Sequence, residues 1–290
     1  MDVSIILVSY NTKDLTLECI KSVYDKTQGI DFDIYVVDNN SCDGSCDAIR
    51  QAYPNVKTIQ NSENKGFGAA NNIAIKQSSA KYIFCLNTDT ILVNNAIKIL
   101  FDYMEENENV GVCGGQLYDR NMEITSSVGN FPTAARIFFQ YFGLRFIFSK
   151  YWKEKLAPAK KLDATSVIPV DYICGADIFF RKSVLDKIGL FDENIFMYGE
   201  ESDLCYRAKQ AGYEVKFIPE SKIIHLCGES SKNLNKRKMI QESLLYWYKK
   251  NLGFMSFVML KFAIITTCIV KYIFLSKPEY KELAIYFSRI

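Results

Sequence analysis

Short apolar runs alternate with helical patterns along the first part of the chain. The runs at 3–10 and 33–37 are rich in Val and Ile and lack polar alternation, which is typical of strands buried on both faces of a sheet. The segment between them carries apolar side chains at helical spacing. Helices are predicted at 12–24, 46–53, 69–77 and 94–106, and further strands at 56–60 and 81–86. This alternation predicts an α/β fold with a doubly wound, mostly parallel central sheet flanked by helices.

The pattern changes beyond residue 110. Residues 116–170 are rich in aromatic side chains but show no clear period, so we expect mainly loops there. Regular patterns then return. Strands are predicted at 171–181, 213–218 and 222–226, and helices at 184–188 and 202–211. We therefore predict one α/β domain over residues 1–230 that consists of two halves, 1–110 and 111–230.

The last part of the chain, residues 231–290, has a different character. Lys232 and residues 236–238 form a basic cluster, and the apolar run 254–275 follows, interrupted by Lys261 and Lys271. A membrane-spanning helix needs about 20 apolar residues, and two lysines inside a span are costly. We predict a helical tail that lies in the membrane interface with its lysines reaching the head groups. The alternative is a helix packed on the domain or on a second subunit of a homodimer.

Composition narrows the classes of protein. The chain has 290 residues, 49% of them hydrophobic and 23% charged, which allows a packed core, and its net charge of +2 argues against a nucleic-acid partner. The 9 cysteines show no zinc-site spacing, so we expect reduced thiols in a cytoplasmic protein, with Cys42 and Cys46 the one pair that could join. Asp2 stands where a signal peptide would carry positive charge, so we interpret the first apolar run as a strand.

Polar side chains follow three of the predicted strands. They are Ser9-Tyr10-Asn11, Asp38-Asn39 and Asn87-Thr88-Asp89. Ligands of open α/β sheets bind beyond the carboxyl ends of the strands, so we expect these loops to meet at one crevice. Asn87 and Asp89 place two oxygen-bearing side chains near one point, as Mg²⁺ requires, although a plain turn is the alternative. Asp38 suits ribose hydroxyls or a base N–H, or else an Asx turn that caps the next helix.

A glycine-rich turn at 66–68 precedes the predicted helix that contains Asn71. Glycine allows the backbone to approach a ligand, and a helix N-terminus favours anions, although a plain tight turn is the alternative. The turn lacks the G-x-G-x-x-G spacing, which excludes a nicotinamide dehydrogenase. Glu200, Glu201 and Asp203 crowd at the start of a helix, where they either complement the helix dipole or include a catalytic base. His225, the only histidine, ends a predicted strand and is either structural or a ligand of metal or phosphate.

The ordered set of motifs resembles the family 2 glycosyltransferases with the GT-A fold, most closely their bacterial rhamnosyltransferase-like branch. The similarity runs from about Val3 to His225. Each motif is common by itself, whereas their order is specific. The motifs are Val8–Asn11, Asp38–Asn39 with Ser41 and Asp43–Ser45, Asn64 with Gly66–Gly68 and Asn71–Asn72, Leu86–Asp89, Cys174–Ala176, Gly189 with Phe191–Glu193, Phe196–Tyr198, and Asp203–Cys205 with Arg207.

The resemblance implies a role for each of these residues. Asp89 would bind a divalent cation, Mg²⁺ or Mn²⁺, together with His225 near the diphosphate, while Asn87 departs from the first acidic position of a DxD motif. Glu201 stands at the position of the catalytic base with Glu200 beside it, where the family has a Glu-Asp pair. The implied nucleotide-sugar contacts are Ser9, Tyr10, Asn11, Asp38, Asn39, Gly66, Phe67, Asn71, Asn87, Thr88, Asp89, Gly175 and Ala176.

The implied reaction is inverting transfer of a sugar in cell-surface polysaccharide synthesis. The donor would be dTDP-rhamnose or otherwise a UDP-hexose, and the acceptor a glycan or a polyprenyl-diphosphate-linked glycan at the inner face of the cytoplasmic membrane. Residues 1–110 would bind the nucleotide, and residues 111–230 the acceptor. A non-catalytic nucleotide-sugar-binding or scaffold protein of a polysaccharide assembly complex is the alternative. A nucleotidyltransferase would want a glycine- and lysine-rich loop after the first strand, where this chain has Ser9-Tyr10-Asn11-Thr12.

Overall fold

The computed structural model describes residues 1–141, 144–151, 160–226 and 234–290. It contains two compact units. The first, here called the α/β unit, comprises Met1–Gly129, Ala159–Phe196 and Glu200–Glu229. The second, the helical unit, comprises Asn130–Pro158, Met197–Gly199 and Ser230–Ile290. The helical unit thus includes a segment near residue 140 in addition to the predicted tail, and the functional boundary at residue 230 stays a prediction.

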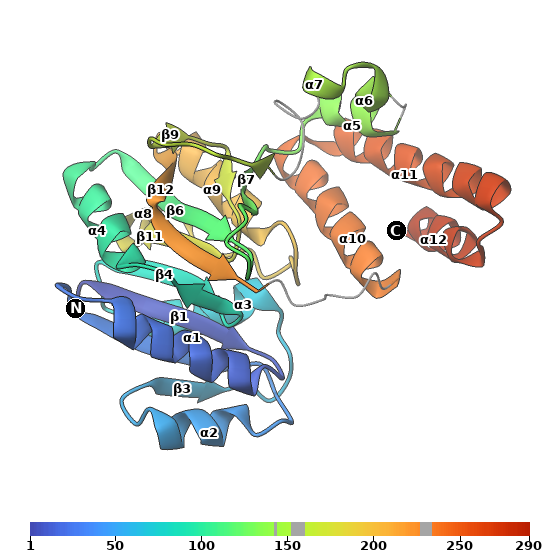
Figure 1. The fold of residues 1–290 in the computed structure, drawn as a ribbon. Helices are drawn as coiled ribbons and strands as arrows, with labels where there is room; N and C mark the ends of the chain where they lie inside the picture. Colours follow the sequence, from blue (N-terminus) through green and yellow to red (C-terminus); the bar gives the residue numbers. More distant parts are fainter. Residues whose placement is uncertain (142–143, 152–159, 227–233) are drawn as a thin grey trace. The chain divides into compact units, whose positions relative to one another are not determined.

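The α/β unit is built on one large mixed sheet (Figure 1). Its strands lie in the order β3-β2-β1-β4-β11-β6-β12-β5, and β9 pairs with β12. The four strands from β3 to β4 are parallel, whereas β11 runs antiparallel to both of its neighbours. The strands are β1 (Val3–Ser9), β2 (Phe32–Asp38), β3 (Lys57–Gln60), β4 (Tyr82–Asn87), β5 (Thr90–Leu92), β6 (Val110–Tyr118), β9 (Ile168–Pro169), β11 (Asp177–Arg181) and β12 (Glu214–His225). The predicted α/β sheet flanked by helices is confirmed.

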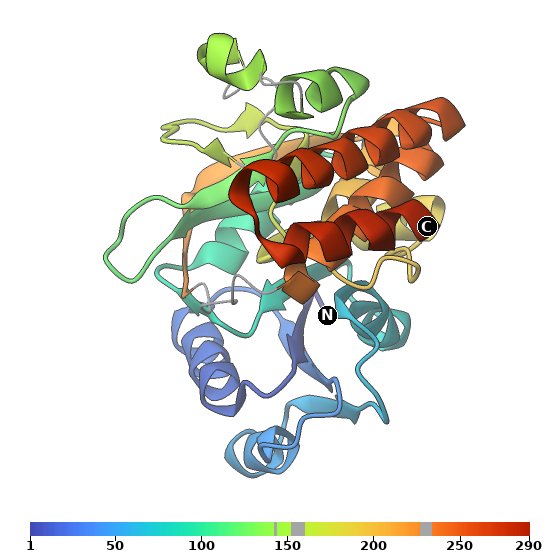
Figure 2. The same cartoon turned by 90° about the vertical axis from the view of Figure 1, so that its right-hand side faces the viewer.

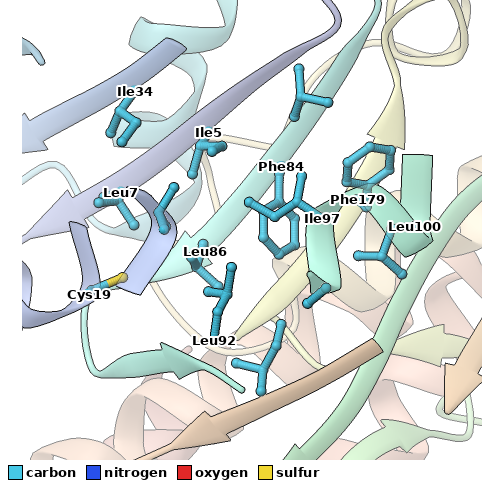
Figure 3. Packing of buried hydrophobic residues seen from close by; sticks show 14 of the residues in the cluster. Ile5, Leu7, Cys19, Ile34, Phe84, Leu86, Leu92, Ile97, Leu100 and Phe179 are labelled. Carbon is cyan, nitrogen blue, oxygen red and sulfur yellow. The ribbon is translucent and has the colours of Figure 1, made fainter. Parts of the chain in front are cut away.

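Helices and a small second sheet complete the unit. The helices are α1 (Lys13–Lys26), α2 (Ser45–Ala52), α3 (Phe67–Gln77), α4 (Ala96–Glu106), α8 (Lys182–Ile188) and α9 (Glu200–Gln210). The second sheet joins β7 (Ser126–Gly129) to β8 (Lys160–Lys161) and β10 (Tyr172–Ile173). Figure 3 shows Ile97 and Leu100 of α4 packed beside Phe84 and Phe179 of the large sheet. Helices cover the central strands, so both faces of these strands are buried and their residues form continuous apolar runs.

Strand β6 occupies residues 110–115, for which the sequence predicted no element, and extends into the start of the region 116–170 that was expected to form loops. Its residues are buried apart from the last, and it lies between β11 and β12. This strand is hard to predict from the sequence because it contains three glycines, and glycine is unfavourable in strands in general. Here tight packing requires them. A Cβ at Gly114 would lie 2.8 Å from the carbonyl oxygen of Asp177, and a Cβ at Gly115 would lie 2.5 Å from that of Ser221.

Two other boundaries differ from prediction. The single strand predicted at 171–181 is divided into β10 and β11 by a turn at 174–176. Conversely, the two strands predicted at 213–218 and 222–226 form one strand, β12. Its pairing with β6 shifts register between Ile218 and Lys222, around Pro219, which has no N–H to donate to a ladder.

The C-terminal segment of the helical unit is helical, as predicted, and its described residues form α10 (Leu234–Asn251), α11 (Phe254–Leu275) and α12 (Pro278–Arg289). The other helices of the unit are α5 (Ala134–Tyr141), α6 (Leu144–Ile147) and α7 (Ser149–Tyr151). Figure 2 shows α11 and α12 side by side. Helix α11 has 22 residues, and its most apolar stretch has a mean hydropathy of 2.0, so its length and composition would allow it to cross a membrane. Lys232 of the predicted basic cluster lies outside the described residues.

Candidate functional site

The carboxyl ends of β1, β2 and β4 lie next to one another. Ser9 at the end of β1 pairs in register with Asp38 at the end of β2, and Val8 pairs with Asn87 of β4. The backbone N–H of Asn39 also donates to the carbonyl oxygen of Ser9, at 2.8 Å. The three polar loops singled out in the sequence therefore leave the same edge of the sheet (Figure 1).

Reciprocal hydrogen bonds hold the loops after β1 and β2 together. The N–H of Asn11 donates to Ser41 Oγ at 2.9 Å, and Asn11 Oδ1 accepts from the N–H of Cys42 at 2.9 Å. Asn11 has a φ of +54°, a region that asparagine tolerates better than most residues. Tyr10 remains 50% exposed beside this contact. The two loops thus form one ordered wall, with an aromatic ring available at its surface.

Asp38 forms the Asx turn expected for its position, and its contact with a nucleoside stays a prediction. Its Oδ1 accepts from the N–H of Ser41 at 2.9 Å, which is the Asx turn considered above. Its Oδ2 is buried and has no hydrogen-bond partner among the described residues. Leaving a buried acceptor unsatisfied costs about 1–3 kcal/mol. A ligand hydroxyl or N–H that reaches Oδ2 would remove this cost, so the residue fits a nucleoside contact.

Asn39 positions the glycine-rich turn. Its side chain is 2% exposed, donates from Nδ2 to the carbonyl oxygen of Gly66 at 3.0 Å, and accepts from Asn61 Nδ2 at 2.8 Å. These bonds occupy both ends of the amide group. A direct nucleoside contact by Asn39 stays a prediction, whereas its structural contact with the turn, and the part played by Asn61, could not be deduced from the sequence.

The turn before α3 packs closely on the segment 191–196. Gly66 has a φ of +82°, and a Cβ there would lie 2.2 Å from the carbonyl oxygen of Phe196. The next N–H, that of Phe67, donates to the same oxygen at 3.0 Å. Asn72 holds the other end of the segment, because its side chain bonds both the N–H and the carbonyl oxygen of Phe191. Glycine at position 66 is therefore required by close backbone approach.

Asn71 lies fully buried in the first turns of α3. Its Nδ2 donates to the carbonyl oxygen of Phe67 at 3.0 Å, whereas its Oδ1 has no partner among the described residues. Like Asp38 Oδ2, this buried oxygen is an unsatisfied acceptor. This geometry is compatible with the predicted donor-pocket role of Gly66, Phe67 and Asn71, which stays a prediction.

The loop after β4 is fixed from both sides. The N–H of Asn87 donates to the carbonyl oxygen of Ala176 at 2.9 Å, at the start of β11. On the other side, Thr88 Oγ1 lies 3.2 Å from Thr12 Oγ1, just ahead of α1. Because β11 runs antiparallel to β4, its beginning meets the end of β4 at the same edge of the sheet. Ala176 thus joins the site by topology.

The structure brings the two predicted metal ligands together. His225 Nε2 lies 3.3 Å from Asp89 Oδ1, and the side chains are 17% and 19% exposed. The N–H of Leu226 also donates to the carbonyl oxygen of Asp89, at 2.8 Å. Among the described residues, no group of three or more His, Cys, Asp or Glu side chains could hold a metal ion. One carboxylate and one imidazole fit a divalent cation whose other positions are filled by substrate phosphates and water.

The acidic residues at the start of α9 have different surroundings. Glu200 is 5% exposed, and a Cβ on Gly68 would lie 3.7 Å from its Cβ. Glu201 is partly exposed, and a Cβ on Gly175 would lie 3.8 Å from its Cδ. Since Gly175 precedes Ala176, Glu201 lies near the edge that holds the loop after β4. Partial exposure beside this edge favours Glu201 over Glu200 as a base that meets an acceptor.

Asp203, the third carboxylate of the cluster, has a structural contact. Its Oδ2 accepts from Arg207 Nε at 2.9 Å, and its side chain is fully buried. The Arg207 guanidinium also donates to the carbonyl oxygens of Ile188, Gly189 and Leu190. Asp203 therefore orients an arginine that closes the end of α8, which explains one of the three crowded carboxylates without a catalytic role.

The glycine-rich turn, the aspartate–histidine pair and the unsatisfied Asp38 oxygen lie by the carboxyl ends of the strands, where open α/β sheets bind their ligands. The sequence profile of the family described as Glycosyl transferase family 2 matches residues 4–189. The chain therefore belongs to glycosyl transferase family 2, and the resemblance stated from its motifs is confirmed.

Three curated relatives are glycosyltransferases of glycan synthesis. The N-acetylglucosaminyl-diphospho-decaprenol L-rhamnosyltransferase of Mycobacterium tuberculosis is 25% identical over 213 residues, which cover 66% of this chain and 66% of the relative. The low-salt glycan biosynthesis hexosyltransferase Agl10 of Haloferax volcanii is 26% identical over 220 residues, 74% of this chain and 64% of the relative. A poly-beta-1,6-N-acetyl-D-glucosamine synthase of Staphylococcus epidermidis is 23% identical, covering 82% and 53%. The chain spans about two thirds or less of the length of these relatives.

Solved structures share the fold at low sequence identity. GalNAc-T7 with UDP, GalNAc and Mn²⁺ superposes with a TM-score of 0.59 at 16% identity over 86% of this chain and 50% of that chain. A mannosyltransferase from Pyrobaculum calidifontis in complex with GDP-Man and Mn²⁺ also gives 0.59 at 16% identity, over 99% and 79%. The fold is therefore of the GT-A type, as predicted.

Proposed function

We propose that this chain is an inverting glycosyltransferase that moves a sugar from a nucleoside-diphosphate donor to an acceptor hydroxyl. The observation that supports this most strongly is the meeting of Asp38, Asp89, His225 and Glu201 around one edge of the sheet, although they come from distant parts of the chain. Asp38 Oδ2, which lacks a hydrogen-bond partner among the described residues, suits the nucleoside. Asp89 and His225 suit the diphosphate, and Glu201 suits the acceptor.

The donor half of the site would act through binding. Asp38 Oδ2 would accept a hydrogen bond from a ribose hydroxyl or a base N–H, with Ser9, Tyr10 and Asn11 lining the same pocket. Asp89 and His225 would hold Mg²⁺ or Mn²⁺, which supplies positive charge to balance the charge that develops on the leaving diphosphate. Thr88 and Asn87 would keep Asp89 in place, because both are anchored to neighbouring elements.

The acceptor half would supply the base. The Glu201 carboxylate would take the proton of the acceptor hydroxyl as its oxygen bonds to the anomeric carbon, while the bond from that carbon to the diphosphate breaks. Attack from the face opposite the diphosphate inverts the anomeric configuration and needs no covalent intermediate. Gly175 leaves room for the sugar beside Glu201, since a side chain at this position would contact the carboxylate.

For the substrates, we propose dTDP-rhamnose as the first donor to test and UDP-hexoses as the second. The acceptor we propose is a glycan linked to a polyprenyl diphosphate, used in cell-surface polysaccharide synthesis. This choice is supported by the mycobacterial relative, which its name describes as a rhamnosyltransferase acting on N-acetylglucosaminyl-diphospho-decaprenol. The rival functions are non-catalytic nucleotide-sugar binding and scaffolding in an assembly complex.

We also propose that the helical unit attaches the protein to the inner face of the cytoplasmic membrane. Residues 231–290 contain eleven Lys and Arg against three Asp and Glu, a net charge of +8, whereas the whole chain has +2. Helix α11 packs through Leu260, Ala263, Ile264 and Cys268. Its exposed face carries Phe254, Met255, Val258, Met259, Phe262, Ile269, Val270, Ile273 and Phe274, here called the apolar face. Basic charge combined with an exposed apolar helix face is typical of interfacial membrane binding.

Sugar transfer tests the proposed reaction. Purified full chain is incubated with Mn²⁺, each candidate donor and a short-chain N-acetylglucosaminyl-diphospho-prenol, and both nucleoside diphosphate and glycosylated lipid are measured. We expect acceptor-dependent release with at least one donor. Glu201→Gln should lower turnover about 10²–10⁴-fold with little change in donor affinity, because the base acts only in the chemical step.

Glu106→Gln is the matched control, since Glu106 is an exposed glutamate at the end of α4. It should leave turnover unchanged. Tight donor binding without any transfer, in wild type as well as in the variant, would contradict the enzyme proposal and favour the nucleotide-sugar-binding alternative. Equal losses of turnover in Glu201→Gln and Glu106→Gln would show that Glu201 is not the catalytic base.

A further inference from the structure

Two adjoining pockets of the helical unit, here called cavities, are open to solvent. The larger has a volume of about 290 Å³ and is lined by residues of α5, α10, α11 and α12. The smaller, of about 240 Å³, lies along α11. Tyr141, Thr267 and Lys271 line both cavities, so the two share a common wall. No part of the proposed transfer reaction uses this space.

The larger cavity carries excess positive charge. Arg237 and Lys271 both line it, and their cationic groups lie 5.7 Å and 5.4 Å from the ring centre of Tyr280. Arg237 is paired with Glu279 at 2.9 Å, whereas Lys271 takes part in none of the ion pairs between described residues. One cation is therefore left without a neutralising carboxylate. Such a site favours an anionic ligand.

The hydroxyl and amide groups of the larger cavity add hydrogen-bonding capacity without adding charge. Tyr141 donates from its hydroxyl to Gln241 Oε1 at 3.2 Å. Burial raises the pKa of Tyr141 to about 12, so its phenol stays protonated at neutral pH. The amide nitrogen of Gln241 is a neutral donor. The excess charge of the cavity therefore comes from Lys271, since Arg237 is paired with Glu279.

The smaller cavity is apolar and reaches the surface of the helix. Phe262 and Val270 line it and are 66% and 45% exposed, and both belong to the apolar face. Ala263 lines the same cavity from the packed side of α11. An apolar chain could therefore run from the apolar face towards Lys271. A ligand that fills both cavities would therefore be an amphiphile, with a charged group at one end and a hydrocarbon chain at the other.

We propose that these cavities form a binding site for a phosphate-bearing lipid, with the phosphate against Lys271 and Arg237 and the hydrocarbon chain between Phe262 and Val270. A prenyl phosphate and a membrane phospholipid share this chemistry. The site is distinct from the donor site and requires no sugar transfer. Lipid binding is therefore measured without any nucleotide. A negative result would contradict this binding site but not the proposed sugar transfer.

The test is equilibrium binding to the full chain in a mild detergent, by calorimetry. The ligands are farnesyl phosphate, a short-chain phosphatidic acid, farnesol and inorganic phosphate. We expect saturable binding of at least one of the two lipid phosphates, and much weaker binding of farnesol and inorganic phosphate. Farnesyl phosphate alone would indicate a prenyl ligand, and phosphatidic acid alone a phospholipid; both results support the site.

Two lysines on the same helix provide a matched pair of variants. Lys271→Gln should weaken binding about tenfold or more, because it removes a charge-assisted contact. Lys261→Gln removes the same charge from α11, but Lys261 lines neither cavity, so affinity should stay as in wild type. Thr267→Leu, which fills the common wall without changing charge, should also weaken binding. Absence of binding by both lipids, or equal losses in the two lysine variants, would overturn the proposal.

Discussion

At the scale of single residues, the most unusual carboxyl group lies away from the proposed chemistry. Asp177 is fully buried in β11. Its Oδ2 accepts from the N–H of Gly115 at 2.6 Å, and its Oδ1 has no partner among the described residues. Burial raises the pKa of Asp177 well above its ordinary value, only partly offset by the Gly115 hydrogen bond. The folded protein therefore keeps the Asp177 proton to a higher pH than the unfolded chain does.

This raised pKa predicts a pH-dependent effect of Asp177→Asn. The folded state binds the Asp177 proton more tightly than the unfolded state, so its contribution to stability is complete below the unfolded pKa and is lost as the pH rises towards the folded pKa. An amide does not titrate. We expect the melting temperature of D177N, relative to wild type, to increase as the pH is raised from about 4.5 to 8. Thermal denaturation across this range measures it.

Asp163→Asn serves as the control, since Asp163 is exposed. Its melting temperature should follow that of wild type at every pH. Parallel curves for D177N and wild type would show that Asp177 gains no proton on folding.

At the scale of elements, the glycine-rich turn before α3 shows how close packing selects a residue. Gly66 combines a positive φ with a backbone contact to Phe196 that leaves no space for a Cβ. Asn39 fixes the same turn from the other side by its bond to the Gly66 carbonyl oxygen. The turn is thus clamped between the loop after β2 and the segment that leads to α9. Its position is coupled to both the nucleoside side and the acceptor side of the proposed site.

Gly66→Ala should therefore destabilise the protein by more than the cost of placing an alanine at a positive φ. Gly212→Ala is a suitable comparison, because Gly212 has a φ of +89° and a Cβ added there would meet no atom within 4 Å. We expect about 1 kcal/mol for Gly212→Ala and at least about 2–3 kcal/mol for Gly66→Ala, which adds a backbone clash. Chemical denaturation measures both. Similar losses for the two variants would mean that the Phe196 contact relaxes easily.

At the scale of the whole molecule, charge is divided unevenly along the chain. The net charge of +8 over residues 231–290 implies −6 for residues 1–230, since the total is +2. The basic part also carries the apolar face of α11, whose members include Phe254, Phe274 and Ile273 at 66%, 81% and 65% exposure. Monomeric soluble proteins rarely expose an apolar surface of this kind. Both features support the membrane attachment that we propose for the helical unit.

Membrane attachment predicts loss of vesicle binding when charge is introduced into the apolar face. The double variant Val258→Glu/Ile273→Glu should float with anionic phosphatidylglycerol vesicles at least about tenfold less than wild type, because each glutamate opposes burial in the acyl region. Raising the salt concentration should also weaken wild-type binding. Met122→Glu changes an exposed apolar residue of the α/β unit and should have no effect.

A different outcome would support the alternative considered from the sequence. If the double variant binds vesicles as well as wild type but converts a dimer to a monomer in light scattering, the apolar face joins two subunits. Neither α11 lysine is altered in this experiment, so its result is independent of the lipid-phosphate site.

Local patterns by themselves determined much of the first half of the fold. The apolar runs of β1 and β4 and the helical spacing in α1 predicted these elements within a few residues, because burial imposes a period on any chain that forms a strand or helix. The polar residues at the ends of β1, β2 and β4 also indicated the site that we propose. Asp38 and Asp89 were identified because parallel strands end at one edge.

Tertiary structure decided the remainder, because it depends on contacts between segments far apart in the chain. Strand β6 contains glycines that look unfavourable until Asp177 and Ser221 are seen against them. The pairing of β12 with β5 brings His225 to Asp89, and the antiparallel course of β11 brings Ala176 to Asn87. The local pattern of apolar residues does not encode the order or direction of strands, so these contacts could not be predicted from it.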